Sequence, residues 1–280
     1  MSPYSRWLAI ACILPLFGCV SVDSSPSPSP NGVARGGKIT LSSADADAIG
    51  RKIWKNECNG TVEGLTSWNS GEDFPSVGIG HFIWYVSGQP GPFEESFPPL
   101  IHYMQRNEVA VPRWVAEAKG SPWKSRNEFL AAQNSAQMKE LRQFLANTVP
   151  SQTGFIVQRL EQALPKMKDA TNGDADRKRL EENFYAVAST RTGVYALIDY
   201  VNFKGEGVKP EERYNGQGWG LRDVLLGMNR HSGGKEAAVE FSESAKRVLT
   251  LRVKNSPSSR GESRWLSGWV NRCESYKHGF

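Results

Sequence analysis

One stretch, residues 62–85, breaks the helical spacing that runs through most of this 280-residue chain. Within it, aromatic and branched apolar residues are separated by Asn-Ser-Gly and Gly-x-Gly sequences, a pattern typical of short strands joined by turns. Around it, apolar residues recur every three or four positions and predict helices. We therefore predict an α+β, mostly helical fold with a small β lobe and a helical bundle body, whose later helices lie at about 135–148, 154–168, 176–203, 219–229, 235–253 and 262–273.

The first 18 residues predict export. Arg6 precedes an apolar run that is too short to span a bilayer and is typical of a signal peptide. The run ends in Leu-Phe-Gly-Cys, which resembles the lipobox of bacterial lipoproteins, so that Cys19 would carry the lipid. An ordinary signal peptide with an incidental cysteine is the alternative.

The position of the anchor follows from the next residues. Neither Val20 nor Ser21 is the aspartate that keeps enterobacterial lipoproteins at the inner membrane. The resemblance therefore implies a periplasmic protein attached through its lipid to the inner leaflet of the outer membrane. Residues 19–38 are rich in Ser, Pro and Gly and predict a disordered tether. Residues 39–280 are long enough for one domain with a substantial core.

Two cysteines remain after export. Cys12 leaves with the signal peptide and Cys19 takes the lipid, so Cys58 and Cys273 are left. In an oxidising periplasm this pair predicts a disulfide between the end of the first helix and the C-terminal helix. Closing so long a loop would contribute roughly 3–5 kcal/mol. Two unpaired buried thiols are the alternative.

The net charge of the chain and the motifs it lacks limit which partners and cofactors we expect it to bind. The net charge is +5, and without Arg6, the only charged side chain of residues 1–18, the mature chain carries +4. A modest positive charge suits an anionic polymer such as a cell wall, but no dense Lys/Arg stripe predicts a nucleic-acid partner. No metal-ligand spacing, phosphate loop or dinucleotide fingerprint is present, so we expect no cofactor. We expect a monomer.

The acid that ends the first predicted helix is the leading catalytic candidate. Serines at 42 and 43 offer caps for this helix, and Ile49 and Ile53 form its apolar face. Glu57 comes four residues after Ile53, at the C-terminal end of the helix and on its buried side. Burial and the helix dipole both disfavour its charge, so we expect Glu57 to keep a proton to a higher pH than in water.

This part of the sequence resembles the lysozyme-like superfamily, which includes phage-type lysozymes and lytic transglycosylases. The resemblance is carried by Glu57, the predicted β lobe that follows it, and Ser-Val-Gly-Ile-Gly-His at 76–81. The resemblance makes Glu57 the catalytic acid, places Trp68 at the family's aromatic position, and places Ser76 where phage-type enzymes carry threonine. It implies cleavage of peptidoglycan glycan strands between N-acetylmuramic acid and N-acetylglucosamine. That reaction needs a neutral carboxyl to protonate the leaving oxygen.

A second carboxylate is less clearly placed. Ser70 stands where the phage-type enzymes have one, while Glu72 and Asp73 lie close by; Glu63 competes with Glu57 on spacing but lies in an apparent loop. Lytic transglycosylases need one Glu only, because the substrate's N-acetyl group acts as nucleophile, whereas a hydrolase would use Glu72 or Asp73. The alternative to an enzyme is a non-catalytic peptidoglycan-binding or assembly lipoprotein on a lysozyme-like scaffold.

Several further residues are candidate substrate contacts. The sequence around Tyr200 and Asn202 loosely resembles the Ala-Tyr-Asn-Ala-Gly element of the transglycosylases, so these two side chains would position the sugar or orient Glu57. The alternative makes Tyr200 a core residue and Asn202 a helix cap. Trp84 and Tyr85 would stack on sugar rings or else close the small core of the β lobe.

His81 and Gln217 complete the set. His81 would contact substrate or, as we favour, act as a hydrogen-bonded buttress of the β lobe. Gln217 lies in a Gly-rich loop, a place where functional residues concentrate, although such loops also serve simply to turn a chain.

Overall fold

The computed structural model describes residues 33–34 and 37–279, which belong to one compact unit. The predicted signal peptide, Cys19 and most of the predicted tether lie outside the described residues. Strand β1 (Val33–Ala34) pairs antiparallel with β2 (Ile39–Thr40), so ordered pairing begins inside the segment predicted as tether. None of the described helices has both the length and the apolar composition that a membrane span requires.

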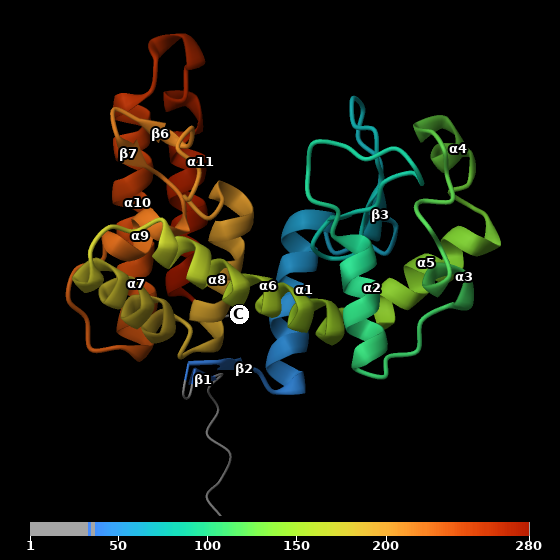
Figure 1. The fold of residues 1–280 in the computed structure, drawn as a ribbon, viewed down its shortest axis with the longest axis horizontal. Coiled ribbons are helices and arrows are strands. Elements are labelled where there is room, and N and C mark those ends of the chain that lie inside the picture. The colour runs from blue at the N-terminus through green and yellow to red at the C-terminus, as the bar shows by residue number, and fades with distance from the viewer. Residues whose placement is uncertain (1–32, 35–36, 280) are drawn as a thin grey trace, which may run out of the picture. The chain divides into compact units, whose positions relative to one another are not determined.

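The described chain is mostly helical, as predicted, with small antiparallel sheets (Figure 1). Short 3₁₀ turns η1, η2 and η3 cover Glu63–Leu65, Ser258–Arg260 and Ser275–Lys277. The helices are α1 (Ser43–Cys58), α2 (Phe97–Arg106), α3 (Arg113–Ala116), α4 (Arg126–Ala131), α5 (Ala136–Asn147), α6 (Val149–Asp169), α7 (Asp174–Val187), α8 (Arg191–Lys204), α9 (Leu221–Leu226), α10 (Gly234–Asn255) and α11 (Ser263–Glu274).

The predicted β lobe is a three-stranded antiparallel sheet in the order β3 (Thr66–Ser67), β4 (Ser76–Val77) and β5 (Phe82–Ile83). A second hairpin, β6 (Arg213–Tyr214) with β7 (Gln217–Gly218), forms in the Gly-rich loop. The turn between β4 and β5 is held by Gln152 of α6, whose Oε1 accepts a hydrogen bond from the backbone of Ile79 at 2.9 Å. Gly78 stands beside that amide with φ +77°, where a Cβ would collide with the same oxygen.

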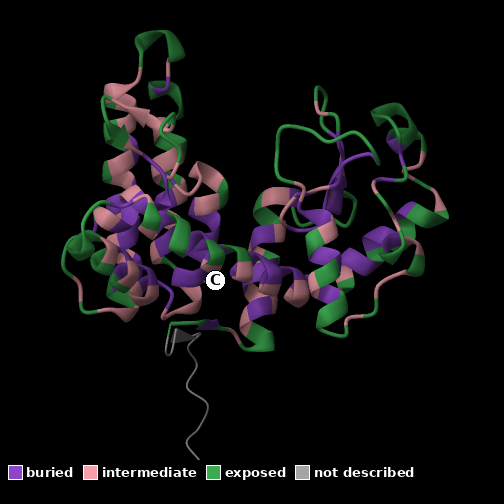
Figure 2. Ribbon diagram, in the orientation of Figure 1, coloured by how far each residue is buried: buried purple, intermediate pink, exposed green. Residues whose placement is uncertain are grey.

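Helix α6 runs through the centre of the unit and packs against α1, α2, α7 and α8. Its buried positions include Ile156, Leu160 and Leu164, spaced for one helical face. Figure 2 shows the buried ribbon concentrated where α1 and α6 meet and inside the group α7–α10. The core thus extends from the β lobe through α6 to the C-terminal helices.

The single helix predicted over 176–203 is wrong, because the chain breaks between α7 and α8. Thr190 starts α8 as its N-cap, and its side-chain oxygen accepts a hydrogen bond from the backbone of Gly193 at 3.0 Å. The break brings the backbones close together, since a Cβ on Gly193 would overlap the carbonyl oxygen of Val187. The apolar residues that recur at helical spacing through this range form an apolar stripe that is nevertheless buried on both helices: Leu180, Phe184, Val187, Tyr195 and Ile198.

This close approach gives a stability prediction. Gly193→Ala is expected to lower the free energy of unfolding by about 1–3 kcal/mol, because the new methyl group must displace backbone. Gly268→Ala is the matched control: Gly268 also lies inside a helix, with no atom within 4 Å of the position that a Cβ would take, and alanine should raise stability by roughly 0.5–1 kcal/mol. Urea unfolding of both variants measures the two effects, and equal stabilities would disprove the close contact.

Candidate active site

Glu57 lies at the end of α1, as predicted. The helix ends at Cys58 because Asn59 turns left-handed at φ 54° and Gly60 continues the turn at φ 68°. The apolar face of α1 is buried through Ile53, one turn earlier. The carboxylate of Glu57 is therefore carried at the edge of the core, with 29% of its side chain exposed.

Arg272 of α11 holds this carboxylate in an ion pair. Its Nη2 donates to Glu57 Oε1 at 3.2 Å, and its Nε and Nη2 donate to the two carboxylate oxygens of Asp199 at 2.7 and 2.8 Å. Asp199 lies on α8 and is only 4% exposed. Arg272 therefore makes two short hydrogen bonds to Asp199 and one longer bond to Glu57, which makes Asp199 its principal partner.

Neutral donors complete the surroundings of Asp199. Tyr276 donates its hydroxyl hydrogen to Asp199 Oδ2 at 2.6 Å, and Tyr195 donates to Oδ1 at 3.4 Å. Asn56, beside Glu57, donates to the Tyr195 oxygen at 2.7 Å. Burial, reinforced by the charge of Asp199, raises the pKa of both tyrosines, so they remain protonated donors. This network joins α1, α8, α11 and η3 around one buried carboxylate.

The cation at the centre of this network stays charged. Burial opposes the charge on Arg272, but hydrogen bonding to Asp199 and the charges of Asp199 and Glu57 raise its pKa, so the guanidinium stays charged. One cation thus faces two carboxylates. The two short bonds between Arg272 and Asp199 already form a neutral, hydrogen-bonded pair, so the buried charge of Asp199 is matched without Glu57.

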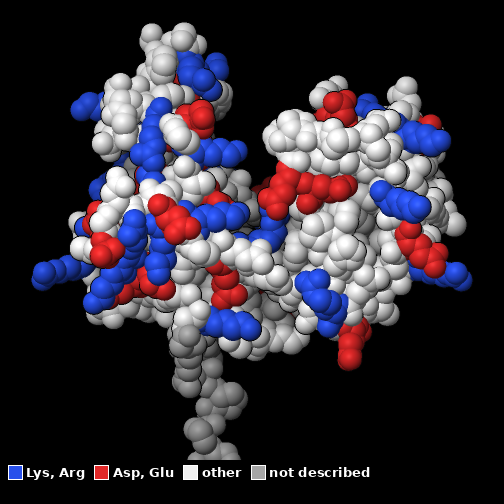
Figure 3. All heavy atoms as spheres, in the orientation of Figure 1, with Lys and Arg blue, Asp and Glu red and all other residues white. Residues whose placement is uncertain are grey.

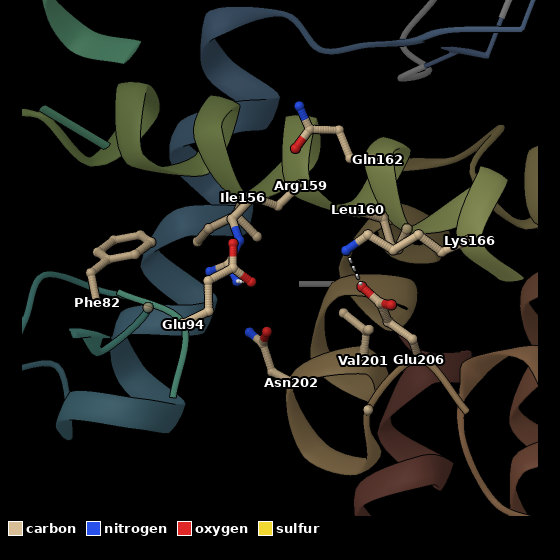
Figure 4. A pocket seen from close by; sticks show the side chains of 13 residues that line it. Phe82, Glu94, Ile156, Arg159, Leu160, Gln162, Lys166, Val201, Asn202 and Glu206 are labelled. Atoms are coloured by element: carbon tan, nitrogen blue, oxygen red, sulfur yellow. Dashed lines mark hydrogen bonds and ion pairs between the residues drawn. The ribbon is translucent and has the colours of Figure 1, made fainter. Parts of the chain in front are cut away.

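A cavity of about 200 Å³ lies beside the end of α8, the helix that carries Asp199. Its floor is α6, one wall is formed by Gly80, Phe82 and Glu94, and the other by the end of α8, including Asn202 and Glu206 (Figure 4). Helix α1 packs against both α6 and α8. Glu57 does not itself line the cavity. Figure 3 shows the surface hollowed between helices α8–α11 and the β3–β5 lobe, with acidic side chains on the rim of the lobe.

Of the two α8 candidates, only Asn202 is available to a ligand. Asn202 is exposed and lines the cavity inside α8, so it is not the helix cap, which is Gly205. Tyr200 is fully buried and donates its hydroxyl hydrogen to the backbone oxygen of Trp219 at 2.9 Å. The substrate-contact role predicted for Tyr200 is therefore wrong, and its core alternative is correct.

The aromatic residues predicted to bind sugar from the β lobe are also core residues. Trp68, Trp84 and Tyr85 are 6%, 1% and 6% exposed. Trp68 donates to the backbone oxygen of Glu72, and Trp84 packs between other aromatic rings. The lobe has so little backbone pairing that these large side chains must provide its interior. The predicted stacking of Trp84 and Tyr85 on sugar rings is therefore wrong, and the alternative, that they close the small core of the β lobe, is correct. Trp68, predicted as a substrate contact at the family's aromatic position, is buried as well.

His81 supports the β lobe through a side-chain contact, which is the favoured of its two predicted roles. It stands at φ +47° after the Gly-x-Gly turn, and its Nε2 lies 3.6 Å from the sulfur of Cys58 at the end of α1. This contact ties the β lobe to the helix that carries Glu57.

The predicted disulfide is absent, because Cys58 and Cys273 are both free and buried. The residues that meet across this interface are their neighbours, Glu57 and Arg272. Successive helical side chains point about 100° apart, so when these two face each other the thiols turn into separate parts of the core. Burial raises the pKa of each thiol to about 12, which leaves both as unreactive thiols.

Among the described residues, no hydrogen bond joins Glu57 to Glu72 or Asp73, the predicted second catalytic groups, and the partner of Glu57 is Arg272. Glu72 lies in the turn between β3 and β4, where its carboxylate accepts a hydrogen bond from Asn69 at 3.2 Å. Ser76 is 6% exposed and is paired within the sheet. Gln217 is exposed on β7 and lines a different cavity, beside α9 and α10. Glu57 is thus the one predicted catalytic residue with a polar network built around it.

Arg272 and Asp199 were not identified as site residues from the sequence. A signal existed for Asp199, which lies between Ile198 and Tyr200 in an apolar stripe. A carboxylate at such a position needs a buried cationic or hydrogen-bonding partner. Nothing local identifies that partner as Arg272, 73 residues further along the chain.

Within residues 37–279, no cluster of three or more His, Cys, Asp or Glu side chains is arranged to hold a metal ion. Comparison of the chain with protein-family models, curated proteins and solved structures found no match.

Proposed function

We propose that this protein cleaves the glycan strands of peptidoglycan between N-acetylmuramic acid and N-acetylglucosamine, with Glu57 as general acid and then general base. The observation that carries the proposal is the partly exposed carboxylate of Glu57, held at 3.2 Å by an arginine that Asp199 already neutralises. Its position at the end of a helix, ahead of a small sheet and a Gly-x-Gly-His turn, supports the resemblance to the lysozyme-like superfamily.

The placement of Glu72 favours the lytic transglycosylase route, which needs one carboxyl group. Protonated Glu57 would give its proton to the glycosidic oxygen as the C1–O bond breaks, while the substrate's own N-acetyl group attacks C1. The resulting Glu57 carboxylate would take the proton from the 6-hydroxyl of the same sugar as its oxygen bonds to C1. No water is consumed, and Glu57 ends the cycle protonated.

Asn202 is the best-placed substrate contact among the predicted residues. Its amide lines the cavity beside the end of α8, one helical turn beyond Asp199. An amide there offers both a donor and an acceptor, which suits an acetamido group.

Mass spectrometry of the products tests the proposal. Purified peptidoglycan incubated with the mature protein should yield fragments that end in 1,6-anhydro-N-acetylmuramic acid. New reducing ends would replace the transglycosylase route with hydrolysis. Absence of any new ends, with binding retained, would overturn the enzymatic proposal and favour a wall-binding protein in which the ion pair of Glu57 with Arg272 serves the fold.

A further inference from the structure

Helix α11 carries an aromatic face that leads away from Glu57. Trp265, Trp269 and Arg272 are spaced by four and three residues, so they lie on one side of the helix, along roughly 10 Å of its axis. The rings of Trp265 and Trp269 stack with centroids 6.0 Å apart and planes at 29°. Trp265 is 44% exposed, although a large apolar side chain is usually covered.

The end of α8 extends this face. The Phe203 ring lies 6.3 Å from Trp269 and 4.5 Å from the guanidinium carbon of Arg272. We call Phe203, Trp265 and Trp269 the aromatic strip. It forms a continuous series of contacts from the arginine that holds Glu57 to an exposed indole.

Two cations on the aromatic strip have no acidic partner among the described residues. The Lys204 ammonium lies 3.4 Å from the Trp269 ring centre and 3.9 Å from that of Phe203, and Arg264 lies 4.5 Å from the Trp265 ring. By contrast, Arg252 nearby is paired with the buried carboxylate of Glu262. Lys204 and Arg264 therefore have hydrogen-bonding capacity available for an anion bound from outside.

The surroundings of Lys204 disfavour the charge on its ammonium group. Burial, followed by the charge of Arg252, lowers the pKa of Lys204 to about 7, and Arg272 adds to the effect. Glu262 and Cys273 act in the opposite direction without restoring the ordinary value. A bound carboxylate would supply the counter-charge that this ammonium lacks.

We propose that the aromatic strip, with Lys204 and Arg264, binds the acidic amino-sugar strand that runs into the Glu57 site. The sugar faces would stack on the two indoles, and the carboxylates of the lactyl groups or peptide stems would pair with the two cations. The inference rests on the proposed function and adds to it: the strip favours a strand bearing carboxylates over a neutral amino-sugar polymer such as chitin.

Binding measured without cleavage tests this inference. In a Glu57→Gln background, we compare the affinities for soluble peptidoglycan strands with peptide stems and for neutral chitotetraose by calorimetry. Adding Trp265→Ala should lower the affinity for both ligands at least fivefold, because the stacking surface is lost. Adding Lys204→Met should lower the affinity for the acidic strand only, by about tenfold. Leu130→Ala is the control, because Leu130 is 45% exposed but lies on α4.

The pH dependence separates a charge effect from a shape effect. Between pH 6 and 8 the ligand carboxylates stay ionised, whereas Lys204, with its pKa of about 7, loses its proton. Affinity for the acidic strand should fall several-fold from pH 6 to pH 8 in the Glu57→Gln protein. It should stay constant when Lys204→Met is added.

The outcomes distinguish this inference from the proposed function. If adding Trp265→Ala or Lys204→Met to the Glu57→Gln protein leaves the affinities for both ligands unchanged, the aromatic strip is not the binding surface. If the strip variants lose binding while Glu57→Gln still cleaves, the binding surface stands and the role of Glu57 falls.

Discussion

Replacing Glu57 by glutamine is expected to lower the rate of glycan cleavage by about 10³-fold or more, because the same carboxyl group acts as acid in one step and base in the next. Glutamine keeps the size of the side chain and an oxygen that can accept from Arg272. Arg272 also keeps its two hydrogen bonds to Asp199. Stability should therefore change by less than about 1 kcal/mol. Release of soluble fragments from purified peptidoglycan measures the rate, and urea unfolding measures the stability.

Glu63→Gln is the matched control for this variant. Glu63 is the competing glutamate in the sequence, and it lies exposed in η1, six residues after Glu57. It should keep most of the cleavage rate. A well-folded Glu57→Gln protein that cleaves at the parent rate would remove Glu57 from the mechanism, and a loss confined to Glu63→Gln would transfer the role to that residue.

The β lobe and most helices could be predicted because hydrophobic periodicity reports which side chains are buried. The same signal failed between α7 and α8. Phe184 and Val187 before the break, and Tyr195 and Ile198 after it, are all buried, so the apolar stripe continues although the helix does not. The break occurs because the Thr190 side chain caps the start of α8, which competes with continuing α7 as one helix. The spacing of apolar residues carries no information about this cap.

The site was predicted only where it depends on local geometry. The place of Glu57 at the end of α1 could be predicted because a helix end can be located from its own sequence. Trp84 and Trp265 carry the same side chain, yet the first is 1% exposed and the second 44%. Their difference comes from tertiary packing between distant elements. For the same reason Arg272, 215 residues from Glu57, could not be assigned to the site before the structure brought α1 and α11 together.

Asp199→Asn is expected to have the largest effect on stability, lowering the free energy of unfolding by about 2–4 kcal/mol. Asparagine keeps the shape but removes the charge that neutralises Arg272, whose side chain is only 32% exposed. The hydroxyl of Tyr276 would also lose a charged acceptor at 2.6 Å. Urea unfolding should show a lower midpoint with an unchanged slope. Glu182→Gln, which breaks an exposed ion pair with Lys178, should cost less than about 0.5 kcal/mol.

A double-mutant cycle decides whether the cost comes from the ion pair. Combining Asp199→Asn with Arg272→Met removes the cation that the first substitution leaves without its principal partner. The combined variant should therefore be more stable than the sum of the single losses predicts, by roughly 1–3 kcal/mol. Strictly additive losses would mean that Asp199 stabilises the fold through the tyrosine hydroxyls alone.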